Sequence, residues 1–177
     1  QARNSGSTTV LTRNRILAFN RTTGTIDTAF NPNANNTVRS LEPAADGQSV
    51  YVGGQFSTIG GGTAFKLARL NVNTGQRITT FNPGVIDALV YDMALVNNRL
   101  FIAGQFTSVN GQPRAKLAEL DPSTGALRSS VNVPFTGTHR GTGSTLIREI
   151  SVTPAGDRLV AIGNFGTVGG LARNQVA

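Results

Sequence analysis

The sequence predicts an all-β fold, a β-propeller built of four-stranded antiparallel blades, with about three blades present as a partial propeller in 177 residues. Three observations predict this fold class. A segment ending in phenylalanine recurs at Phe56, Phe106 and Phe165, at spacings of 50 and 59 residues. Turn signals divide each repeat into four short stretches, and no longer window shows sustained helical periodicity. Four short strands in roughly fifty residues are typical of a propeller blade.

The repeat sets the expected blade boundaries. Blade repeats are expected at approximately 15–62, 63–112 and 113–171, and 172–177 begins a further blade. The longer second spacing places an insertion in the third repeat. Near the N-terminus, two residues are expected to align with the third strand of the next repeat: Leu17 and Ala18 with Leu67 and Ala68.

Each blade is expected to contain four strands, a to d in chain order. The alternation of polar and apolar residues over 77–81 is typical of a half-buried strand. Gly75 lies in the turn before it, because glycine tolerates the positive φ that a hairpin loop requires. The expected ranges are 38–41, 90–93 and 147–150 for strand a, 50–56 and its copies for strand b, 66–70 for strand c and 77–81 for strand d.

The glycines of strand b need a physical reason. Glycine inside a strand weakens it unless another group approaches closely. We expect a phenylalanine of the neighbouring blade to occupy that space, so that glycine and phenylalanine together anchor the packing of the blades. The structural anchors predicted in this way are Gly54, Phe56, Gly104, Phe106, Gly163 and Phe165.

The repeat resembles a known family at three places, the stretches 50–61, 67–75 and 81–83. It is similar to the delta-60 repeat, and the resemblance covers about 13 to 177. It implies a β-propeller of the kind found in secreted and surface-attached bacterial proteins, especially of actinobacteria, and therefore an extracellular location. It implies no common activity.

Two other propeller groups fit less well. Kelch and quinoprotein repeats share part of the pattern, but each carries a tryptophan that this chain lacks. The calcium and quinone ligands of quinoproteins also have no matching cluster. We therefore expect no cofactor and no metal ion.

Propellers close with about four to eight blades. Three blades are too few, so we expect the chain to be part of a larger propeller. The remainder of that propeller is the predicted partner, on the same parent chain or on a cleaved companion chain.

Composition excludes several classes of function. The absence of cysteine excludes disulfide scaffolds and thiolate metal sites, and a single histidine cannot supply a transition-metal site. No apolar run is long enough for a membrane-spanning helix. The net charge of +7 comes from dispersed basic residues, so nucleic-acid or polyanion binding is kept only as an alternative.

Candidate binding residues lie on the longer loops, d to a and b to c, which share one end of the blades. Function concentrates on such loops when a rigid scaffold presents them. The loop at 134–146 carries the insertion and the only histidine, although a solvated glycine-rich loop would also explain it. The candidate ligand-binding residues are His139, Arg140, Arg114, Asn35 and Asn36.

The leading functional hypothesis is a non-catalytic, structural or binding module in a secreted or cell-surface assembly, with a partner protein or a glycan as ligand. No catalytic residue is assigned. The alternative is a glycan-active hydrolase that uses Asp87 or Asp92, since such enzymes need a pair of carboxylates.

Overall fold

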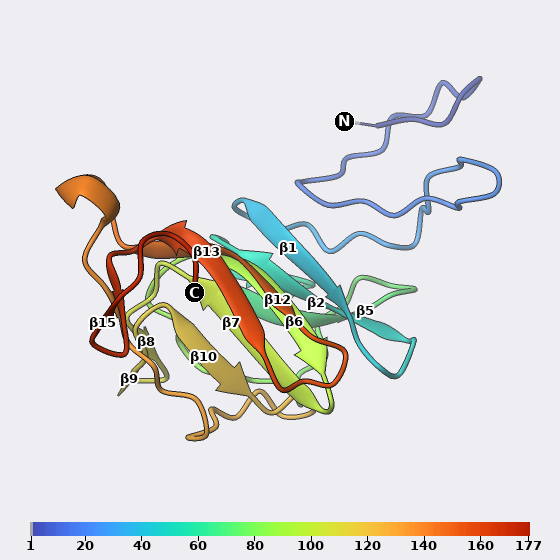
Figure 1. Cartoon of the computed structure of the whole chain (residues 1–177). Helices are drawn as coiled ribbons and strands as arrows, with labels where there is room; N and C mark the ends of the chain where they lie inside the picture. The colour runs from blue at the N-terminus through green and yellow to red at the C-terminus, as the bar shows by residue number, and fades with distance from the viewer. Residues whose placement is uncertain (1) are drawn as a thin grey trace.

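The computed structural model describes residues 2–177 and shows an all-β chain, a partial β-propeller (Figure 1). Three of its antiparallel sheets are larger than the hairpins described below and follow one another along the chain. Within the described residues the only helix is a short 3₁₀ turn, and none is long and apolar enough to cross a membrane. The sheets are β1 (Val38–Pro43), β2 (Ser49–Gly54) and β5 (Leu67–Asn71); β6 (Val90–Val96), β7 (Arg99–Gly104) and β10 (Leu117–Leu120); and β12 (Leu146–Val152) with β13 (Leu159–Asn164).

Each sheet is one blade, with strand a at its inner edge. Because β1, β2 and β5 form one sheet, the first blade begins at strand a and crosses the expected boundary between 62 and 63, and the second crosses that between 112 and 113. Strand b pairs with strands a and c in the first two blades, in the order β1-β2-β5 and β6-β7-β10. The inner strands β1, β6 and β12 lie next to one another. A propeller places these strands around its axis, so residues of strand a lie closest to that axis.

Small hairpins project from the b-to-c connections, which the sequence analysis treated as loops. Each is a tight two-stranded ribbon, and β11 (Phe135–Thr136) adds a strand to the third. These ribbons are β3 (Thr58–Ile59) with β4 (Gly62–Thr63), β8 (Ser108–Val109) with β9 (Gln112–Pro113), and β14 (Thr167–Val168) with β15 (Leu171–Ala172).

The fourth strand is shorter than expected. Segment d of the first blade joins strand c through one isolated bridge, Leu70 with Arg77, and the second blade repeats this with Leu120 and Leu127. The chain then turns, with the Phe81 N–H donating to the carbonyl of Ile78. The turn carries the Phe81 ring out of the sheet into the interface with the next blade, where it is buried. Segment d therefore stops pairing with strand c where the Phe81 ring enters the interface between the blades.

The alignment of the N-terminal segment is corrected by one residue. Phe19 bridges Ile26 as Leu70 bridges Arg77, so Ile16, not Leu17, corresponds to Leu67. The left-handed backbone position just before strand c agrees with this register. It recurs at Arg15, Lys66, Lys116 and Gln175.

The glycines of strand b have a different reason from the one expected. A Cβ atom on Gly54, Gly104 or Gly163 would overlap a backbone carbonyl of the same blade, at or just before the start of strand a, and not a phenylalanine of the neighbouring blade. A β-bulge near the start of strand a brings the chain this close in all three blades. The overlapped carbonyls belong to Thr37, Leu89 and Leu146.

Two apolar clusters hold the blades together. Tyr51 and Phe81 of the first blade, with ring centroids 5.2 Å apart, belong to a buried cluster that includes Met93 of the second. Phe135 and Phe165 meet edge to face at 5.0 Å in the cluster between the second and third blades. Phe56, Phe106 and Phe165 are all fully buried.

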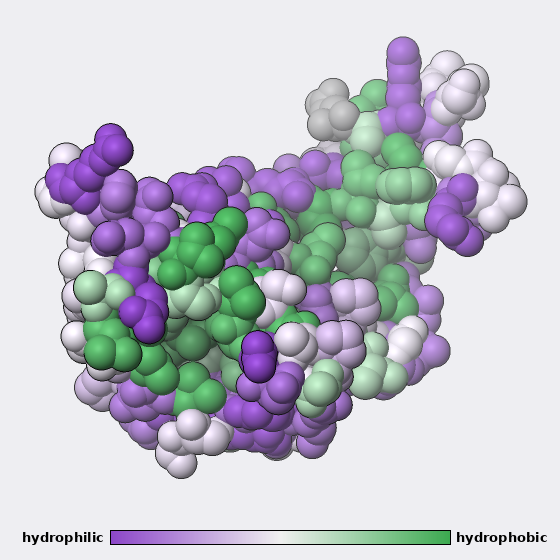
Figure 2. All heavy atoms as spheres, viewed as in Figure 1, coloured by the Kyte–Doolittle hydropathy of each residue, from purple (hydrophilic) through white to green (hydrophobic). Residues whose placement is uncertain are grey.

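The outer side of the third blade leaves apolar residues exposed. Val160 and Val176 are 48% and 55% exposed, whereas the residues at the same repeat positions in the second blade, Phe101 and Leu117, are buried beneath the third blade. Figure 2 shows the resulting apolar surface over β13 and β15. In the first and second blades, the equivalent side packs against the following blade.

Candidate functional site

The candidate residues of the insertion lie on a short 3₁₀ turn, His139–Gly141, at the loop end of the third blade. Asn164 holds this turn. Its Oδ1 accepts the N–H of His139 at 2.8 Å, and its Nδ2 donates to the carbonyls of Thr142 and Ser144 at 2.9 and 3.1 Å. Arg140 is exposed and His139 partly so. Asn164 was not among the residues predicted from the sequence, although it stands where the other two blades have a glutamine.

Asn35 ties two connections of the first blade together. Its Oδ1 accepts the N–H groups of Ser57 and Thr58, and its Nδ2 donates to the Ser57 hydroxyl at 2.9 Å. Its side-chain amide is therefore used within the fold. Asn36 beside it is exposed and, within residues 2–177, accepts only from Thr37.

Asp87 does in the second blade what Asn35 does in the first. Its Oδ1 accepts the N–H groups of Thr107 and Ser108 at 2.9 and 3.1 Å, and its Oδ2 accepts the Thr107 hydroxyl. Partial burial acts to raise the pKa of Asp87, but these hydrogen bonds outweigh it and lower the pKa. A lowered pKa suits a carboxylate that braces a loop, and it is the opposite of what a general acid needs.

Asp92 joins three blades. Its Oδ1 accepts the Ser40 hydroxyl of the first blade at 3.1 Å, and its Oδ2 accepts the Ile150 N–H of the third at 2.8 Å. Glu42 makes a similar bond to the N–H of Leu95 at 3.1 Å. Both carboxylates therefore fix the spacing between inner strands.

Arg114 is buried, with 7% of its surface exposed, so its guanidinium is not presented at the surface. It donates to the carbonyls of Pro113 at 2.7 Å and Arg128 at 3.2 Å. Arg13 makes the same kind of bonds, to the carbonyls of Thr12 and Thr28. These arginines hold segment d against the b-to-c connection.

The five candidates are thus not brought into one site. His139 and Arg140 share the insertion, Asn35 and Asn36 share a loop of the first blade, and Arg114 lies inside the second. No hydrogen bond joins these three places among the described residues.

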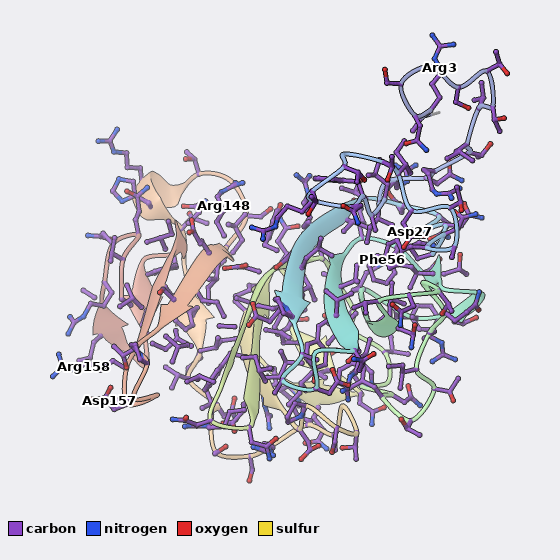
Figure 3. All side chains as sticks on the ribbon, turned by 90° about the vertical axis from the view of Figure 1, so that its right-hand side faces the viewer. Arg3, Asp27, Phe56, Arg148, Asp157 and Arg158 are labelled. Atoms are coloured by element: carbon purple, nitrogen blue, oxygen red, sulfur yellow. The ribbon has the colours of Figure 1, made fainter. Side chains whose placement is uncertain are left out.

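A different group of residues meets at the inner strands. The guanidinium carbon of Arg39 lies 5.8 Å from the centroid of the Tyr91 ring, and that of Arg148 lies 5.4 Å from it. Each of the three is the extra residue of the bulge in its own blade, as the strand registers show. Figure 3 places Arg148 between the third blade and β1. The sequence could have revealed this group, because the three occupy the same repeat position.

The opposite end of the blades carries ion pairs. Glu119 is buried and accepts from Arg99 at 2.9 and 2.7 Å, from Arg128 at 3.4 Å and from Ser130 at 2.6 Å. The hydrogen bonds from Arg99, with those from Ser130 and Arg128, outweigh burial and lower the pKa of Glu119 to about 2. Glu119 is therefore a structural anion at neutral pH.

An open groove of about 440 Å³ separates the first two blades at the same end. Several polar side chains of its lining are engaged within the protein. Arg69 pairs with Asp46 at 2.7 Å, and the Tyr51 hydroxyl donates to the carbonyl of Pro122 at 2.6 Å. No unpaired nucleophile and base converge among these residues.

Comparison with known proteins agrees with the fold. The model of the Rax2 C-terminal beta propeller domain matches residues 16–140, which is more than half of the chain. A search of curated proteins finds no match. The matched region covers the first two blades and the start of the third. The chain therefore belongs to the family of the Rax2 C-terminal beta propeller domain.

Proposed function

We propose that this β-propeller is a non-catalytic binding module of an extracellular assembly. The observation that carries the proposal is the loop end of the blades, where braced loops leave Asn36 and Arg140 exposed on a rigid scaffold. Asn35, Asp87 and Asn164 supply the braces. Rigid presentation reduces the conformational entropy lost on binding. The resemblance to delta-60 repeats supports the secreted or cell-surface location.

The engagement of the acidic side chains supports a role without catalysis. A glycosidase needs one carboxylic acid with a raised pKa and a second carboxylate across a cleft. Asp87 has a lowered pKa and closes a loop, and Asp92 bridges strands. Neither carboxylate is free to approach a sugar.

We further propose that another blade of the same kind covers the apolar side of the third blade, on the same parent chain or on a companion chain. Val160 corresponds to Tyr51 and Phe101, both of which are buried against the following blade. Leu41 on the first blade, 53% exposed, has the repeat position at which Met93 and Ile150 pack on the preceding blade. The two exposed sides therefore have complementary roles in blade packing.

A glycan array combined with an assay for released sugar tests the binding proposal. Binding without turnover, weakened by the loop variants Arg140→Ala and Asn36→Ala, is the expected result. Gln48→Ala, an exposed change at the other end of the blades, serves as the control. Sugar release that disappears in Asp87→Ala or Asp92→Ala, with the fold intact by circular dichroism, would instead establish the hydrolase.

A further inference from the structure

We propose that Arg39, Tyr91 and Arg148 form an oxyanion-binding site at the inner strands, and that its ligand is an acidic segment of a partner protein. This inference rests on the proposed binding function and specifies the chemistry of the partner. It concerns residues other than the loop candidates.

The backbone directs the three side chains to one place. Arg39, Tyr91 and Arg148 each lie on the bulge that starts strand a, at the loop end of the blade. A bulge re-aims the side chain of the extra residue. Because β6 lies between β1 and β12, the two arginines reach Tyr91 from the blades on either side, at 5.8 and 5.4 Å.

The two guanidinium groups are free to bind a ligand. Arg39 and Arg148 are exposed and make no ion pair or side-chain hydrogen bond with any described residue. Three other arginines of the blades, Arg69, Arg99 and Arg128, differ in that each pairs with a carboxylate. An unpaired guanidinium presents a planar fork of N–H donors that matches a carboxylate.

The site is held rigid by the bonds beneath it. Asp92, the residue after Tyr91, accepts from Ser40 at 3.1 Å and from the Ile150 N–H at 2.8 Å. Ser40 follows Arg39 in the chain, and Ile150 is two residues beyond Arg148. The same carboxylate therefore fixes the spacing of all three inner strands, and with it the spacing of the two guanidinium groups. Glu149 is exposed and does not pair with Arg148.

The arrangement favours an acidic peptide over a sugar or a nucleic acid. With a guanidinium group approaching from each side, the Tyr91 ring is not free to stack a pyranose or a base. Nucleic acids and sulfated glycans are held by many basic contacts, whereas this site offers two. Two guanidinium forks and a phenolic hydroxyl can satisfy two carboxylates of one extended segment.

Fluorescence anisotropy with the whole chain tests the site. The probe is fluorescein-labelled hexaglutamate at low salt, with hexaglutamine as the neutral control. We expect Arg39→Gln with Arg148→Gln to weaken binding at least about tenfold, since it removes the charge-assisted hydrogen bonds of both guanidinium groups. Arg21→Gln with Arg158→Gln removes the same charge from two other exposed positions and should change binding less than about twofold.

Each outcome decides the inference. Equal weakening by the two pairs would overturn the site, because the effect would then come from net charge alone. Tighter binding of heparin or single-stranded DNA, dependent on the same arginines, would overturn the acidic peptide as ligand. If the glutamine pair unfolds the chain, Arg39→Lys with Arg148→Lys is used instead, because lysine keeps the charge but lacks the planar fork of N–H donors. Hexaglutamate binding that is not weakened in this variant would overturn the proposal that the guanidinium forks recognise the ligand. Failure of hexaglutamate with glycan-array binding intact would overturn this inference alone and leave the proposed function standing.

Discussion

The carboxylate of Asp92 accepts a hydrogen bond from the backbone N–H of Ile150, 2.8 Å away, across the interface between the second and third blades. A carboxylate that was a catalytic candidate from the sequence is thus a connection between blades. Its second oxygen makes the corresponding connection to Ser40 of the first blade.

Asp92→Ala is expected to lower the free energy of unfolding by about 2 kcal/mol, because it leaves the partly buried Ile150 N–H without its acceptor. Urea denaturation followed by circular dichroism measures the change. Asp92→Asn keeps an acceptor oxygen and should lose less. Glu149→Ala is the matched control, and a similar loss in that variant would mean that the effect is not specific to the bridge.

Gly104→Ala is expected to destabilise the chain by about 3 kcal/mol, because the new Cβ would overlap the Leu89 carbonyl. Backbone atoms cannot move aside as a flexible side chain can. Gly166→Ala meets only ordinary contacts, of 3.5 Å or more, and is the control. Equal thermal midpoints for the two variants would contradict the close approach at strand b.

Acid should weaken the fold through Glu119. Its pKa is lowered from 4.5 to about 2, so the ionised form stabilises the folded state above pH 4.5. This contribution, on the order of 3 kcal/mol, disappears as the pH falls from about 4.5 to 2. Glu119→Gln should remove that part of the pH dependence in urea titrations at pH 7, 4 and 3. An unchanged slope in this variant would show that other carboxylates are responsible.

Val160→Ala is expected to change the stability of the chain by less than about 0.5 kcal/mol, because the side chain is half exposed on the uncovered side of the third blade. Phe101→Ala, at the same repeat position in the second blade, should lose about 3–5 kcal/mol. Chemical denaturation of both variants checks the contrast. A large loss at Val160 in the isolated chain would contradict the proposal that another blade is needed to bury it.

Repetition made the blades predictable. The positions of β2, β7 and β13 follow from copies of one apolar segment, and the phenylalanine at its end is buried in each copy. The short extent of segment d could not be predicted, because the alternation over 77–81 is compatible with a strand. Phe81 leaves the sheet to fill an interface with the next blade, and this interface exists only once the blades are stacked.

The candidate site was harder to predict from the sequence than the blades were. His139 and Asn35 were identified by loop length and residue type, which do not show whether a polar side chain is already used. Both Asn35 and Asn36 are exposed, but the amide of Asn35 is hydrogen-bonded to the b-to-c connection of its blade, whereas that of Asn36 bonds to the adjacent Thr37. Arg114 and Arg148 look alike as arginines in the sequence, yet one is buried against carbonyls and the other is exposed.

The sequence by itself determined the all-β class, the repeat and the approximate place of each blade, because these depend on local periodicity and turn residues. Only the tertiary structure decided why Gly54 is a glycine and which polar side chains remain free. Thr37 crowds Gly54 through a bulge. Arg39, Tyr91 and Arg148 meet because three inner strands, each about fifty residues from the next, are brought together by packing between blades.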